Sequence, residues 1–150
     1  MRSIRPILLG TLSLVLLAAS DATAQRAADF AQGVDYRIEA SLDETAQVLR
    51  GRARLRYTNN SRATLDTLWI HQHLNAFRPN SAWARRELEY GERRFTDLGP
   101  DEHAFERFGS VTIDGAAVRP VYPGAPDSTV AALPLPRRLA PGQSVTVVMD

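Results

Sequence analysis

The chain has 150 residues, of which 44% are hydrophobic, and its formal net charge is +1. This near-neutral balance provides no broad positive field, which argues against a nucleic-acid-binding protein and against attachment to anionic lipid. There is no cysteine, so structural disulfides, thiolate zinc sites and a cysteine nucleophile are excluded within the chain.

The N-terminal segment has the parts of a secretion signal. Two arginines lie in the first five residues, and residues 7–19 form an uncharged apolar run that is shorter than the roughly 20 residues of a membrane-spanning helix. Ala22-Thr23-Ala24 fits a signal peptidase site, which predicts cleavage between Ala24 and Gln25. We therefore expect residues 1–24 to be a signal peptide and the protein to be exported to the periplasm or the cell exterior. No membrane attachment is expected after cleavage, since no cysteine follows that could be lipidated.

The remainder is about the length of one domain, and it is formally neutral because the signal segment carries the net charge of +1. Residues 25–33 are a small, polar lead-in, and residues 34–150 are expected to form one β-rich domain. Two alternating segments open this domain. Val34–Leu42 and Arg50–Tyr57 each place apolar side chains on one face, and the short turn between them predicts an antiparallel pair.

Four arginines, at positions 50, 52, 54 and 56, share one face of the second predicted strand. They cannot all be buried, so we expect that face to meet water or acidic partners. Asn59-Asn60-Ser61 follows and can be read either as a turn or as an N-glycosylation sequon, and we favour the turn. A third strand is predicted over Leu68–Leu74, with Trp69, His71 and His73 on one face.

Residues 76–109 interrupt the strand rhythm and form a long excursion. A short helix is predicted over Ser81–Tyr90, with Asn80 or Ser81 as N-cap and Gly91 just past its end. Scattered aromatic residues are expected to anchor the excursion on the sheet. Long ordered loops of this kind are often functional.

Strand patterns return in the last third of the chain. The four predicted strands cover residues 110–113, 117–121, 130–135 and Val145–Met149. An Asp114-Gly115 hairpin turn joins the first two. We expect Pro134 and Pro136 to end the third of these. The fold class predicted is therefore all-β: an antiparallel sheet or saddle-like sandwich of about seven strands with one long, partly helical insertion. Since the pattern stops within a strand, we expect the chain to be part of a longer precursor.

No complete catalytic constellation is present. His71 and His73, two apart on a strand, could bind zinc together with His103, but ordinary surface histidines are the favoured interpretation. Carboxylates that could serve a glycosidase are expected instead to lie in a solvated loop; they are Asp97, Asp101, Glu102 and Glu106. There is no Gly-rich phosphate loop, no Gly-x-Ser-x-Gly elbow and no His-Glu-x-x-His helix. We predict no catalytic, cofactor-binding or metal-binding residue in this chain.

Four segments, taken in order, resemble the N-terminal β-domain of bacterial gluzincin metallopeptidases, the aminopeptidase N-like family. They are Tyr36–Asp43, Leu49–Ser61, Leu65–Phe77 and Leu133–Val145. The third fits best, with Leu68-Trp69-Ile70-His71-Gln72-His73-Leu74-Asn75-Ala76-Phe77. The resemblance covers most of residues 34–150 and consists of apolar and turn positions, and residues 78–108 resemble an insertion of exported members.

The resemblance implies a non-catalytic domain. In the family, a zinc-activated water attacks the peptide carbonyl in a following domain that carries His-Glu-x-x-His. This chain lacks that motif, so no catalytic residue of the family transfers to it and zinc is expected only in the parent protein. The implied role is to flank the active-site cleft and limit the access of peptide substrates, with the downstream catalytic domain as partner.

Two alternatives remain open. The chain could be a secreted β-sandwich that binds sugar or protein through the aromatic residues of the excursion. It could also be a small periplasmic metal-binding protein that uses His71, His73 and His103.

Overall fold

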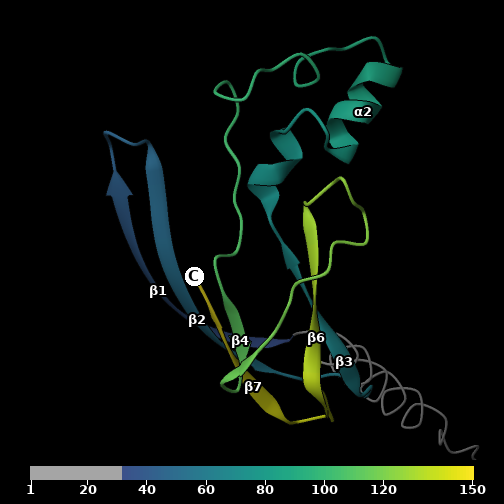
Figure 1. Ribbon diagram of the computed structural model, residues 1–150. Coiled ribbons are helices and arrows are strands. Elements are labelled where there is room, and N and C mark those ends of the chain that lie inside the picture. Colours follow the sequence, from purple (N-terminus) through teal and green to yellow (C-terminus); the bar gives the residue numbers. More distant parts are fainter. Residues whose placement is uncertain (1–31) are drawn as a thin grey trace, which may run out of the picture.

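The computed structural model describes residues 32–150 (Figure 1). The predicted signal peptide, its cleavage site between Ala24 and Gln25, and nearly all of the lead-in lie outside the described residues. The described range contains seven strands, which are β1 (Gly33–Asp43), β2 (Val48–Thr58), β3 (Leu65–His71), β4 (Val111–Ile113), β5 (Ala116–Ala117), β6 (Val130–Leu139) and β7 (Ser144–Met149). It also contains the 3-10 helix η1 (His73–Phe77) and the α-helix α2 (Ala82–Glu89).

The predicted fold class is confirmed, because every strand pairing is antiparallel and one long, partly helical excursion interrupts the strands. A five-stranded sheet has the order β1-β2-β7-β4-β5, and β3 and β6 form a separate two-stranded sheet. The excursion between β3 and β4 rises beyond one end of the two-stranded sheet (Figure 1). No helix within residues 32–150 is long and apolar enough to cross a membrane.

The hydrophobic core lies between the two sheets. The five-stranded sheet contributes Leu55, Ile113 and Val147, and the two-stranded sheet contributes Leu133 and Leu139. Each of these side chains is buried, with an exposed fraction of 3% or less. Where the two sheets overlap, one face of each strand packs on the core and the other meets solvent, which is the expected cause of the alternation seen in the sequence.

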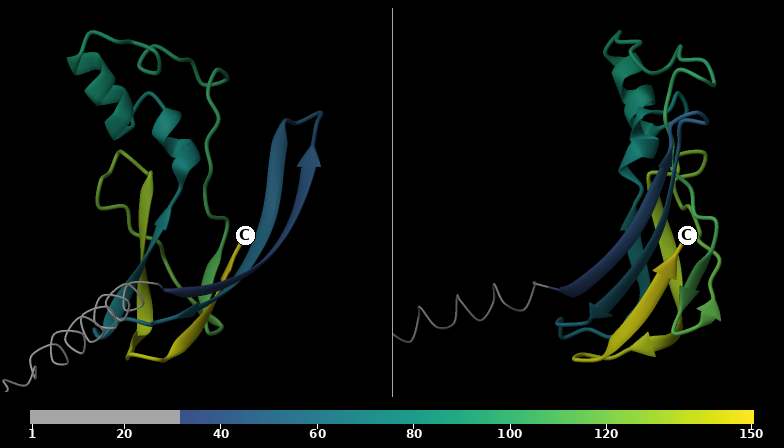
Figure 2. Two further views of the ribbon diagram at one scale, coloured as in Figure 1. Left: turned by 180° about the vertical axis from the view of Figure 1, so that it is seen from behind. Right: turned by 90° about the vertical axis from the view of Figure 1, so that its left-hand side faces the viewer.

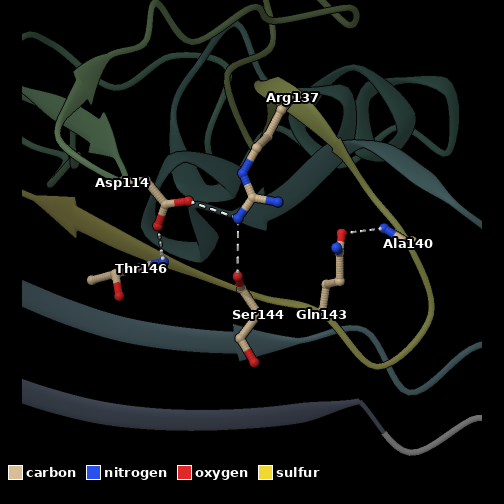
Figure 3. Close-up of polar contacts among 6 residues, drawn as sticks. All are labelled: Asp114, Arg137, Ala140, Gln143, Ser144 and Thr146. Carbon is tan, nitrogen blue, oxygen red and sulfur yellow. Dashed lines mark hydrogen bonds and ion pairs between the residues drawn. The ribbon is translucent and has the colours of Figure 1, made fainter.

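The predicted Asp114-Gly115 hairpin turn is confirmed. Both residues have positive φ, 51° and 84°, as a tight two-residue hairpin turn requires. Asp114 also ties the turn to its neighbours, because its Oδ2 accepts a hydrogen bond of 3.2 Å from Arg137 of β6 and its Oδ1 accepts one of 2.9 Å from the Thr146 amide of β7 (Figure 3). In the adjacent turn, the Gln143 side chain accepts a bond of 3.0 Å from the Ala140 amide.

The predicted third strand was too long at its C-terminal end. β3 ends at His71, and His73 and Leu74 lie in η1. Gln72 is the last residue in line with β3: it is buried, its amide donates to the Thr129 carbonyl at 2.7 Å in continuation of the β3–β6 register, and its side chain accepts a bond of 2.8 Å from Tyr122. The backbone of Gln72, with φ −99° and ψ 77°, departs from the extended conformation, and the chain turns into η1.

Two predictions for later strands were also wrong. β6 continues through both prolines to Leu139. The missing proline amides cost little, because in a two-stranded sheet one edge of each strand has no full strand partner. The register with β3 also shifts between Leu65 and Thr67, next to the prolines. β5 stops at Ala117, and beyond Pro120 only Val121 pairs, forming a bridge to Ala132 of β6.

The predicted excursion helix is confirmed as α2. Ser81 is its N-cap, and the Ser81 hydroxyl accepts a hydrogen bond of 2.9 Å from the Ala84 amide. Gly91, just past the helix, has φ of 80°, a backbone conformation that favours glycine.

Candidate interaction surface

The three histidines considered as zinc ligands are not brought into one site. The rings of His71 and His73 stack, with centroids 5.2 Å apart and planes 10° from parallel. His103 lies in the excursion, where its Nδ1 is 2.8 Å from the Gly99 carbonyl oxygen. Within residues 32–150, no group of three or more His, Cys, Asp or Glu side chains is placed to hold a metal ion.

The candidate carboxylates hold the excursion together rather than converge on a site. Asp97 forms a two-bond ion pair with Arg93, both bonds at 2.7 Å. Glu102 accepts a hydrogen bond of 2.7 Å from the Gly99 amide, and Glu106 accepts one of 3.1 Å from the Leu74 amide. Asp101 is exposed on the loop.

Two further polar residues, Asn75 and Asp127, anchor the excursion to the sheets. Asn75 is buried, and its side-chain amide donates to the carbonyls of Glu106 and Ser128 at 2.9 and 3.1 Å. Asp127 accepts bonds from the amides of Ala82 and Thr129. Burial acts to raise the pKa of the Asp127 carboxyl. The Thr129 hydroxyl also donates to this carboxyl, and its bond together with the two amide bonds outweighs burial and holds the pKa below the ordinary value.

Asn59 resolves the choice between a turn and a sequon in favour of the turn. Its side chain is fully buried, and its amide donates to the carbonyls of Ala63 and Leu139 at 2.8 and 3.0 Å. Its carbonyl oxygen accepts bonds from the Ser61 amide and hydroxyl. A side chain with all of these partners presents no free amide for a glycan in the folded state.

The clearest candidate surface is the apolar face of the β1–β2 hairpin. Four large side chains on that face are mostly exposed: Tyr36 by 66%, Ile38 by 65%, Leu42 by 63% and Leu49 by 69%. The register Tyr36↔Leu55, Ile38↔Ala53 and Leu42↔Leu49 places them on the same face as core residue Leu55. The uncovered surface is thus a continuation of the core-facing side of the sheet.

The hairpin is uncovered because it is longer than the layers beside it. β7 pairs with β2 only over Ala53–Thr58, and the five residues of β2 before Ala53 have β1 as their sole strand partner among the described residues. Figure 1 and the left view of Figure 2 show the tip of the hairpin diverging from the two-stranded sheet. The exposed area is on the order of 500 Å², at the upper end of what monomers leave open, and patches of this size mark interaction sites.

A second, smaller candidate lies on the excursion, which carries three aromatic rings in contact. Phe77, Trp83 and Phe95 have ring centroids 5.3 to 5.5 Å apart. Phe77 and Trp83 are 39% and 43% exposed, so the cluster is half open to solvent. The sequence predicts aromatic anchors in this segment, but only the structure shows that three of them meet.

Comparisons with protein-family models, with curated proteins and with solved structures give no match for this chain.

Proposed function

We propose that this chain is the non-catalytic scaffold and gating domain of an exported zinc metallopeptidase of the aminopeptidase N-like kind. The observation that carries the proposal is the uncovered apolar face of the β1–β2 hairpin. An apolar surface continuous with the core is typical of an interface with a permanent neighbour, and a catalytic domain in the same polypeptide would supply that neighbour. The order of the four resembling segments supports the choice of family.

The proposal assigns this chain no step of the reaction. Zinc and its ligands would belong to the catalytic domain, where the metal activates water for attack on a peptide carbonyl. This chain would hold that domain through the hairpin and form one wall of the approach to its cleft. Residues 1–24 would direct the protein out of the cytoplasm.

The first test is the reading frame beyond the codon for Asp150, which we expect to encode His-Glu-x-x-His. In the longer polypeptide, Ile38→Asp should lower kcat/KM for an aminoacyl p-nitroanilide at least about tenfold. An unpaired charge in a closed interface costs more than the roughly 1.4 kcal/mol that corresponds to a factor of ten. Ser41→Asp, on the opposite face of the same strand, is the matched control and should leave kcat/KM within about twofold. A frame without the motif, or equal effects of the two variants, would contradict the proposal.

A binding module is the second candidate, because the half-exposed cluster of Phe77, Trp83 and Phe95 offers ring faces of the kind that stack on sugars. If this candidate is correct, the chain alone binds cello- or chito-oligosaccharides, detected as a change in tryptophan fluorescence. Trp83→Ala should then weaken binding about tenfold, whereas Trp69→Ala, at an exposed position of β3, should leave it unchanged. The absence of binding to either sugar series would argue against a sugar-binding module.

A further inference from the structure

β1 is the edge strand of the five-stranded sheet, and it is long. Each of its 11 residues, Gly33–Asp43, is matched with a residue of β2 on one side, and at this length the strand extends over about 37 Å. On its other side no strand of residues 32–150 pairs with it, and Figure 1 shows this border as the outer margin of the hairpin. A free edge of this length offers about ten backbone hydrogen bonds to another antiparallel strand.

β1 lacks the features by which proteins usually protect a sheet edge. It contains no proline and no lysine, and its register with β2 runs from Gly33 to Asp43 without a bulge. All of its charged residues lie on the polar face of the hairpin, so none of them points to the core-facing side. A long, regular edge of this kind is a template for pairing with another chain.

The sequence of β1 is complementary to itself when two copies run antiparallel. If Ile38 lies opposite Ile38 of a second copy, all 11 residues are paired, because Ile38 is the central residue of the strand. In this register Arg37 lies opposite Glu39 of the second copy, and Glu39 opposite its Arg37, while no pair joins like charges. The apolar positions match as well, in the pairs Tyr36–Ala40 and Val34–Leu42.

The neighbouring registers place like charges opposite each other. Moving the centre of symmetry to Arg37 pairs this residue with itself and pairs Asp35 with Glu39. Moving it to Glu39 pairs that residue with itself and pairs Asp35 with Asp43. Like charges directly opposite each other destabilise a strand pair, so the charges select the register centred on Ile38. Exposed ion pairs contribute little energy, so the backbone bonds and the apolar contacts supply most of the affinity.

A second copy would also improve the charge balance of the polar face. Arg37 lies opposite Arg54 of β2, and this is the one pair of like charges in the hairpin register. In the dimer, Glu39 of the second copy brings a carboxylate to this pair from the free side of β1. The other opposed positions on this face are already balanced or carry a single charge; they are Asp35–Arg56, Glu39–Arg52, Ser41–Arg50 and Asp43–Val48.

We propose that two copies of this chain associate edge to edge through antiparallel β1 strands, with Ile38 of each copy at the two-fold axis. The five-stranded sheets of the two copies then form one continuous sheet, and the contact is isologous. The apolar faces of the two hairpins lie on the same side of that sheet and meet at Ile38. The association is independent of the proposed peptidase role, because it uses the edge of β1 rather than its apolar face.

Sedimentation equilibrium of the purified protein tests the association, and we expect a dimer at concentrations of about 10 to 100 µM. Arg37→Glu creates two pairs of like charges across the contact and should weaken dimerisation at least about tenfold. The double variant R37E/E39R restores opposite charges in the same register and should dimerise within about threefold of the unchanged protein. Arg50→Glu is the matched control, because it makes the same charge change at an exposed position of β2, away from the β1 edge. It should leave dimerisation within about twofold.

The register is tested by single cysteines, since the chain has none of its own. Ile38→Cys places two sulfur-bearing residues opposite each other with Cα atoms about 5 Å apart, within the range that a disulfide bridges. Mild oxidation should therefore link the dimer covalently, as seen on a non-reducing gel. Ala40→Cys lies on the same face but about 14 Å from its counterpart, so it should not be linked.

A protein that stays monomeric over this concentration range would overturn the proposal, and so would equal linking of the two cysteine variants. Equal effects of Arg37→Glu and Arg50→Glu, or no recovery in R37E/E39R, would also overturn it. A dimer that Leu49→Ser weakens and Arg37→Glu does not would be formed by the apolar face, which contradicts the edge contact. Thermal unfolding of each variant checks that the fold is retained, which we expect because the substituted side chains are exposed.

Discussion

Leu133→Ala should lower the free energy of unfolding by about 3 kcal/mol, within the range of roughly 2–5 kcal/mol found for leucine truncation in protein cores. Leu133 is fully buried, lies on β6 opposite Leu68, and belongs to the cluster that joins the two sheets. Its removal would leave a cavity between a two-stranded and a five-stranded sheet. The two-stranded sheet has little to stabilise it apart from that contact, because an isolated pair of strands is marginal in water.

Urea unfolding followed by circular dichroism measures this effect as a shift of the midpoint at constant slope. Leu42→Ala is the matched control, since it removes the same atoms from a side chain that is 63% exposed. We expect it to change the free energy of unfolding by about 0.5 kcal/mol or less. Similar losses for the two variants would show that β6 does not pack as described.

Asn59→Ala should lower the free energy of unfolding by about 2–3 kcal/mol, because it leaves buried polar groups without partners. The Asn59 side chain donates to the Leu139 carbonyl, and its backbone amide and carbonyl pair with Gln143 and Gly142. One residue therefore connects the turn after β2 to the turn between β6 and β7.

Asn80→Ala provides the comparison, because Asn80 is exposed and its side chain makes one long hydrogen bond of 3.4 Å to the Pro126 carbonyl. Its free energy of unfolding should fall by less than about 0.5 kcal/mol. Asn59→Asp keeps the acceptor for Ser61 and loses the two donors, so we expect a loss comparable to that of Asn59→Ala. Full stability in Asn59→Asp would mean that the donor bonds contribute nothing.

The strands that the sequence predicted correctly are those with one apolar and one polar face. β1, β2 and β7 follow this pattern: the core covers one side of β7 and of the second half of β2, whereas the same side of β1 is mostly exposed. Helix α2 was predicted from local signals that sufficed on their own: the Ser81 cap and the glycine at position 91. The Asp114-Gly115 turn was predicted for the same reason, since its backbone geometry depends on two adjacent residues.

The errors occur where a distant contact overrides a local pattern. β3 ends early where Gln72 is tied to Thr129 and Tyr122, which lie 57 and 50 positions further along the chain. β6 passes its prolines because its only full strand partner in the described range is β3. Neither contact leaves a periodic signal in the segment that it changes.

The sequence alone determined the all-β class, the amphipathic alternation of the hairpin and the absence of a His-Glu-x-x-His motif, because each is a local property of residue order. Only the tertiary structure decided how much of the apolar face is covered. That depends on the length and position of the two-stranded sheet, which pairs residues 65–71 with residues 130–139 across the whole excursion. Alternation shows that a strand has an apolar face, but the neighbouring layer decides whether that face is buried, and here the layer ends before the hairpin does.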